Sequence, residues 1–62
     1  MNFQVGQELE FSIFGTIVKG TFVKCADIAD GVVTIMTTYD SVIPEEIGKE
    51  QDINLDYLII KN

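Results

Sequence analysis

Polar and apolar residues alternate most regularly near the start of the chain, over residues 8–13. The apolar positions of this run are Leu9, Phe11 and Ile13, each separated from the next by one polar residue. A period of two predicts a β-strand with one buried face. With these three side chains pointing inward, the alternation places Phe14 on the outer face.

Gly15 separates this strand from a second apolar run over residues 16–26. The pairs Ile17-Val18 and Phe22-Val23 do not both fit one strict alternation. We therefore expect a bulge or sharp bend at Gly20 that changes which side chains face inward. A long strand bent at a glycine is what a small barrel needs to turn its corner.

The strongest strand signal is the β-branched run over residues 32–39, which follows an Asp-Gly turn signal. Val42 and Ile43 predict the beginning of a short fourth strand, and Pro44 confines that strand to an edge of the sheet or marks the end of the strand. The polar segment that follows, up to Asp52, predicts a connection with one helical turn at its proline.

Residues 53–56 predict a tight 3-10 turn, followed by a last strand over residues 57–60. These patterns predict an all-β fold: a small five-stranded, partly open antiparallel barrel that forms one domain over residues 1–62. Phe11 and Phe22 are expected in its core. The core of a 62-residue chain is marginal, and the single cysteine, Cys25, allows no internal disulfide.

Catalysis is disfavoured because the chain lacks His and Arg, the residues that most often act as general base and anion clamp. Cys25 has no histidine to activate it and is interpreted as a structural thiol. The spacing of Asp27 and Asp30 is typical of turn chemistry and lacks the loop pattern of a calcium site. We therefore expect no enzyme activity, no metal and no cofactor.

The net charge of −6, from ten acidic residues and four lysines, disfavours direct binding to nucleic acid. The simplest role of this acidity is to keep an apolar protein soluble. No stretch is long and apolar enough for a membrane span, and the N-terminus lacks the pattern of a signal peptide. Together with the free cysteine, this predicts a cytoplasmic location.

Apolar residues exceed what one small interior holds, since residues 32–36 and 58–60 are apolar on both faces of their predicted strands. Loops and barrel ends cover such residues in many small proteins, but we expect an interface here. The candidate contact residues are Phe14, Val32, Met36 and Tyr39. The predicted function is a non-enzymatic protein-interaction module that associates with itself or docks on a protein partner.

Two alternatives stay open. The first is an inhibitor that mimics nucleic acid, whose acidic side chains imitate phosphates and occupy a basic cleft. Its candidate residues are Glu8, Glu10, Glu45, Glu46, Glu50 and Asp52. Mimicry requires these acids on one face, at spacings close to the roughly 7 Å between successive phosphates of a strand. The second alternative is an oligomer that binds a small molecule where subunits meet.

The opening of the chain resembles that of Src-homology-3-like small barrels, which occur in many bacterial and phage proteins. The resemblance rests on Val5-Gly6, then Leu9 and Phe11, and later glycines at 15 and 20. The ending over residues 53–59 is similar to the 3-10 turn and fifth strand of that architecture. The resemblance implies the barrel fold and a bacterial, phage or mobile-element source.

The paired glycines at 15 and 20 also resemble the first motif of the Sm-like family. The chain departs from that family afterwards. Residues 26–31 replace its Asp and Met-Asn, and its Arg-Gly is absent. Those residues form the RNA pocket in the family, so the RNA-binding function does not carry over.

Overall fold

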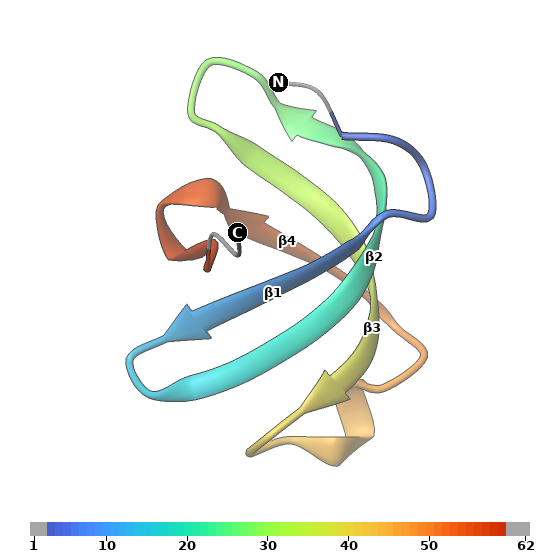
Figure 1. Ribbon diagram of the computed structural model, residues 1–62, viewed down its shortest axis with the longest axis vertical. Helices are drawn as coiled ribbons and strands as arrows, with labels where there is room; N and C mark the ends of the chain where they lie inside the picture. Colours follow the sequence, from blue (N-terminus) through green and yellow to red (C-terminus); the bar gives the residue numbers. More distant parts are fainter. Residues whose placement is uncertain (1–2, 60–62) are drawn as a thin grey trace.

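The computed structural model describes residues 3–59 and shows four antiparallel strands in one open sheet, in the order β1-β2-β3-β4 (Figure 1). The elements are β1 (Glu8–Ile13), β2 (Thr16–Asp27), β3 (Val32–Asp40), the 3-10 turn η1 (Pro44–Glu46), β4 (Glu50–Asn54) and the 3-10 turn η2 (Leu55–Tyr57). The all-β prediction is confirmed. The first three strands also lie where the hydrophobic pattern placed them.

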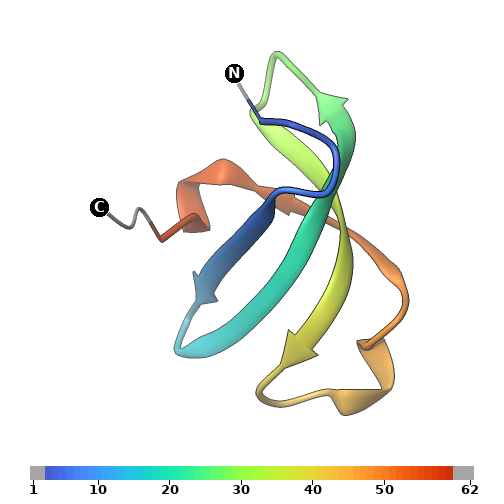
Figure 2. The same cartoon turned by 45° about the vertical axis from the view of Figure 1, so that its right-hand side comes forward.

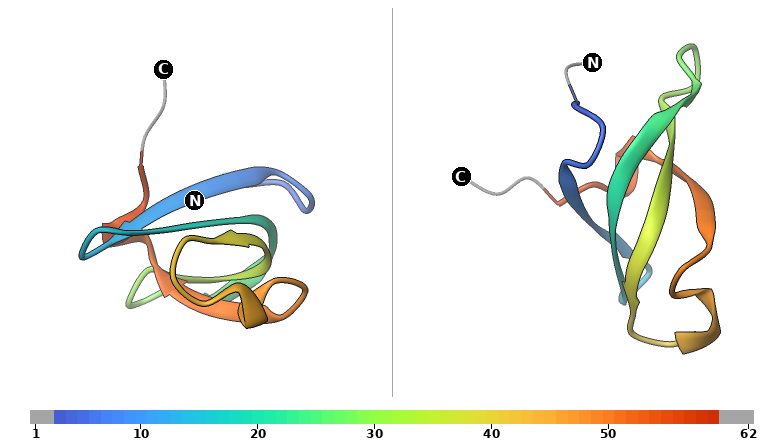
Figure 3. Two further views of the ribbon diagram at one scale, coloured as in Figure 1. Left: turned by 90° about the horizontal axis from the view of Figure 1, so that it is seen from below. Right: turned by 90° about the vertical axis from the view of Figure 1, so that its right-hand side faces the viewer.

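The sheet is strongly twisted and coils around one core (Figures 2 and 3). Its two edge strands, β1 and β4, both contribute to the same cluster of buried side chains. The cluster consists of Leu9, Phe11, Val18, Phe22, Val33, Ile35 and Ile53. Phe11 is fully buried and Phe22 is 9% exposed, which confirms that both belong to the core.

Gly20 lies on β2 close against β3. The pairing register shifts between Lys19 and Gly20, so the expected irregularity is present. The expected change of face is wrong, because Val18 and Phe22 on either side of it both point into the core. A Cβ at Gly20 would lie 2.6 Å from the carbonyl oxygen of Met36, so the glycine serves close strand packing.

The strand predicted at Val42 and Ile43 is absent. The Asp40 carboxylate accepts hydrogen bonds from the backbone N–H groups of both residues, at 2.9 and 2.8 Å, and this turns the chain away from the sheet. The helical turn predicted at the proline is confirmed as η1 (Pro44–Glu46).

The fourth strand instead begins at Glu50, within the segment predicted to be a polar connection. Ile53 is 5% exposed and fills the core from this strand. The Gln51 side chain also lies on the inner side, where it donates a hydrogen bond to the Thr37 hydroxyl at 3.0 Å. One apolar side chain and one hydrogen-bonded amide are enough for the inner face of a short edge strand.

The 3-10 turn predicted before the last strand is confirmed as η2, one to two residues later than expected. Beyond it, Leu58 forms an antiparallel bridge with Phe11, and the Ile59 N–H donates to the Glu10 carbonyl at 2.9 Å. The remainder of the predicted last strand, Ile60, lies outside the described residues.

Candidate functional site

Phe14 and Gly15 form the two-residue turn of the hairpin between β1 and β2, where Ile13 pairs with Thr16. Both turn residues have positive φ, 50° at Phe14 and 88° at Gly15. Such turns favour Asn-Gly or Asp-Gly, because a bulky side chain at positive φ is strained. Phe14 is also 91% exposed, so its predicted outward orientation is confirmed, although it lies in the turn rather than on the strand.

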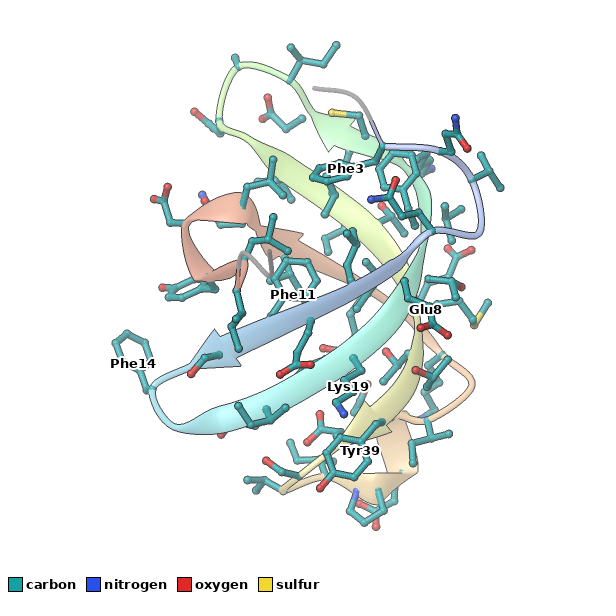
Figure 4. The ribbon with its side chains drawn as sticks, viewed as in Figure 1. Phe3, Glu8, Phe11, Phe14, Lys19 and Tyr39 are labelled. Carbon is teal, nitrogen blue, oxygen red and sulfur yellow. The ribbon has the colours of Figure 1, made fainter. Side chains whose placement is uncertain are left out.

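The ring of Phe14 has one neighbour that the sequence did not indicate. Its centroid lies 5.8 Å from that of Tyr57, at an interplanar angle of 63°, in an edge-to-face arrangement. Tyr57 belongs to η2, is half-buried and packs against the core. The exposed ring therefore makes one edge-to-face contact with a residue that packs against the core, and it projects from the end of the hairpin (Figure 4).

Met36 and Tyr39 lie on the outer face of β3, where they are 36% and 46% exposed. The Lys19 ammonium on the adjacent strand lies 5.5 Å from the centre of the Tyr39 ring and 4.0 Å from a carboxylate oxygen of Glu10. Val32, the fourth predicted contact residue, is half-buried at the start of β3. The predicted contact residues therefore do not form one patch.

Further exposed apolar residues lie in the connection between β3 and β4. Val42 is 64% exposed, and Ile43 and Ile47 are nearly half exposed. The first two residues were expected in a strand, and the third was not among the expected contact residues. The sequence feature that could have indicated these exposed apolar residues is the presence of branched aliphatic side chains in an otherwise polar segment.

The six acidic residues predicted to share a face do not all do so. Glu8 and Glu50 lie at the two ends of one row across the outer face, in which Thr21 and Met36 occupy the middle positions. Glu10 and Asp52 extend this face from the same edge strands, whereas Glu45 and Glu46 lie apart from it in η1.

A groove of about 590 Å³ runs beside β1. Its apolar lining includes Phe3, Leu9 and Leu58, and its polar lining includes Glu8 and Lys19. The labelled side chains of Phe3, Glu8 and Lys19 are seen around this part of β1 in Figure 4. This groove lies within a single chain. It is therefore not the pocket between subunits that the small-molecule alternative requires.

The residues considered for chemistry have local structural roles. The Asp27 carboxylate accepts the Asp30 N–H at 3.2 Å, so the turn interpretation of this pair is confirmed. The half-buried Cys25 thiol lies 3.7 Å from the Val32 carbonyl oxygen. Within residues 3–59, no three or more Asp, Glu, Cys or His side chains form a group that could hold a metal ion. No helix in this part of the chain is long and apolar enough to cross a membrane.

The chain matches no family model, and no curated protein or solved structure is significantly similar to it.

Proposed function

We propose that the protein is a non-enzymatic interaction module that binds a second copy of itself or another protein through Phe14 and Tyr57. The observation that carries this proposal is the state of Phe14, which is 91% exposed and held at positive φ. A turn selected for stability alone would carry Asn or Gly at this position. A strained and exposed aromatic residue is typical of a site that makes contact with a partner.

The support beneath the ring favours the same function. Tyr57 packs against the core and lies edge-to-face with the Phe14 ring, so this contact favours one orientation of the exposed ring. A pre-oriented aromatic ring loses little side-chain freedom on binding, and aromatic anchors carry much of the binding free energy at protein interfaces.

The proposal includes the Src-homology-3-like architecture, a partly open barrel with a fifth strand over residues 57–60. The bridge between Leu58 and Phe11 and the hydrogen bond from the Ile59 N–H to the Glu10 carbonyl support it, because both add the end of the chain to the free edge of β1. With that addition, the barrel would place Tyr57 next to the hairpin of Phe14.

Mimicry of nucleic acid has partial support. Glu50 and Asp52 are two residues apart on one strand, which places their side chains roughly 7 Å from each other, close to the phosphate spacing. Glu8 and Glu10 repeat that spacing on β1. However, Lys19, Met36 and Tyr39 lie between these two pairs on the same face, and a phosphate mimic gains nothing from a cation or apolar side chains there.

The test is site-specific photocrosslinking with p-benzoylphenylalanine in place of Phe14. We expect a covalent dimer of the purified protein, or one defined adduct in extract of the native host. Excess unmodified protein should compete, and the Phe14→Asn variant should not, because asparagine relaxes the turn while removing the ring.

The matched control places the same crosslinker at Val5, which is 81% exposed and also adjoins a glycine turn. Equal adducts from positions 5 and 14, or full competition by Phe14→Asn, would show that exposure alone produces the crosslink. Either result would overturn the proposed role of Phe14.

A further inference from the structure

The second edge of the sheet, on β4, is unpaired within the described residues. β4 (Glu50–Asn54) pairs with β3 on one side and ends the strand order. In the right-hand view of Figure 3, β4 (orange) forms the outer side of the sheet, with β3 (yellow) on its other side. An unpaired strand edge presents a row of N–H and C=O groups to any extended segment that approaches it.

The hydrogen bonds at both ends of β4 define which of its backbone groups face β3. The Thr37 N–H donates to the Lys49 carbonyl at 2.9 Å, and the Leu55 N–H donates to the Gly31 carbonyl at 2.7 Å. Both contacts belong to one antiparallel register. The direction of backbone groups alternates along an antiparallel strand, so the odd-numbered residues of β4 bond to β3.

The even-numbered residues therefore direct their backbone groups outward. Glu50, Asp52 and Asn54 each place an N–H and a C=O on the free edge. The side chains of Glu50 and Asp52 lie on the outer face, in the cross-strand rows of Met36 and Thr34. The Thr34 hydroxyl donates to an Asp52 carboxylate oxygen at 2.5 Å, which fixes that carboxylate beside the edge.

The charge along this edge is negative. β4 itself carries Glu50 and Asp52, and the nearest charged residues before and after it in sequence are Lys49 and Asp56. A second copy would fit poorly here, because antiparallel pairing of β4 centred on Asp52 would place two Asp52 carboxylates directly opposite each other. Like charges in that position destabilise a strand pair.

We infer that the free edge of β4 binds an extended basic segment of another protein by strand addition, with Lys or Arg opposite Glu50 and Asp52. The backbone groups provide a general affinity for an extended chain, and the two carboxylates select the basic sequence. This site is separate from Phe14 and Tyr57, and it does not depend on the function proposed for them.

The geometry specifies the pattern of the partner. Glu50 and Asp52 are two residues apart on one face, so the partner needs basic residues at positions i and i+2 of its strand. The residue between them would point to the inner side, where Gln51 and Ile53 lie, and an apolar residue suits that position. The expected motif is therefore basic-apolar-basic.

The test uses nuclear magnetic resonance with an acetylated peptide, Thr-Val-Lys-Val-Lys-Val-Thr, and a control peptide of the same composition with adjacent lysines. The first peptide should shift the Glu50, Asp52 and Asn54 amides and slow their hydrogen exchange, with at least a fivefold lower Kd than the control. N-methylation of both lysines should abolish binding, because in an antiparallel pairing opposite Glu50 and Asp52 their N–H groups face β4, whereas N-methylation of the central valine should not.

Charge is tested with Glu50→Gln/Asp52→Asn, which keeps both side-chain acceptors. We expect a five- to tenfold weaker affinity, as for two exposed charge pairs. Glu8→Gln/Glu45→Gln removes the same charge elsewhere and should change the affinity less than twofold. Equal binding of both peptides, equal effects of the two variants, or shifts confined to Phe14 and Tyr57 would each overturn the inference. Slowed exchange of the β4 amides with rising protein concentration and no peptide would assign the edge to a second copy instead.

Discussion

At the scale of single residues, Gly20 has no room for a side chain. A Cβ there would lie 2.6 Å from the Met36 carbonyl oxygen and 2.7 Å from Cδ1 of Ile35. We predict that Gly20→Val lowers the free energy of unfolding by about 1–3 kcal/mol or more, because strand separation or side-chain strain must make space. Urea denaturation would measure this, with Thr21→Val on the outer face as control. Equal midpoints for the two variants would contradict the close packing.

The four phenylalanines provide a second test because two of them occupy opposite environments. Phe11 is fully buried, so Phe11→Ala should cost about 3–5 kcal/mol and unfold much of a domain of this size. Phe14→Asn should leave the melting temperature within a few degrees of the parent, since it removes turn strain together with one aromatic contact. Thermal unfolding followed by circular dichroism compares them. A loss at Phe14 equal to that at Phe11 would show that the hairpin ring stabilises the fold.

At the scale of elements, the connection after β3 depends on the ionised Asp40 carboxylate. Its pKa is held below the ordinary value of 3.8 by hydrogen bonds from the backbone N–H groups of Ile43 and Val42, with a smaller effect from the Gln51 side chain, while burial acts in the opposite direction. A carboxyl whose pKa falls on folding stabilises the native state above its unfolded pKa. That stabilisation is lost as the pH falls through the folded pKa.

We therefore predict that Asp40→Asn is less stable than the parent at pH 5–7, because a charged acceptor forms the stronger hydrogen bonds. The difference between the two proteins should shrink below about pH 4. Urea midpoints from pH 3 to 7 would measure it. A difference that stays constant into acid would show that Asp40 acts only through its shape.

The success of sequence-based prediction differed between central and edge elements. The strands β1, β2 and β3 were predictable because each places two apolar residues in the core, an even number of positions apart as on one face of a strand. β4 was missed because its inner face needs only Ile53 and the hydrogen-bonded Gln51. Conversely, Val42 and Ile43 are apolar but are withdrawn from the sheet by hydrogen bonds to Asp40, which hydrophobicity does not report.

Only part of the candidate contact surface around Phe14 could be predicted from the sequence. The outward orientation of Phe14 follows from local alternation and was confirmed. Its contact with Tyr57 joins residues 43 positions apart in sequence, and no local pattern indicates such a pairing. The free edge of β4 was likewise inaccessible to sequence analysis, because it depends on which strand ends the sheet.

At the scale of the whole molecule, the net charge of −6 predicts opposite effects of salt on binding at the two proposed surfaces. Two copies that meet through Phe14 repel each other, so their association should strengthen as salt screens the repulsion, with a Debye length falling from about 30 Å at 0.01 M to about 8 Å at 0.15 M. Binding of a basic segment to β4 should weaken over the same range, because salt screens an attraction there. Light scattering across protein and salt concentration measures the first effect, and peptide titration measures the second. A mass of 6.9 kDa at every salt concentration up to millimolar protein would overturn self-association, and Phe14 would then be left to contact a different protein.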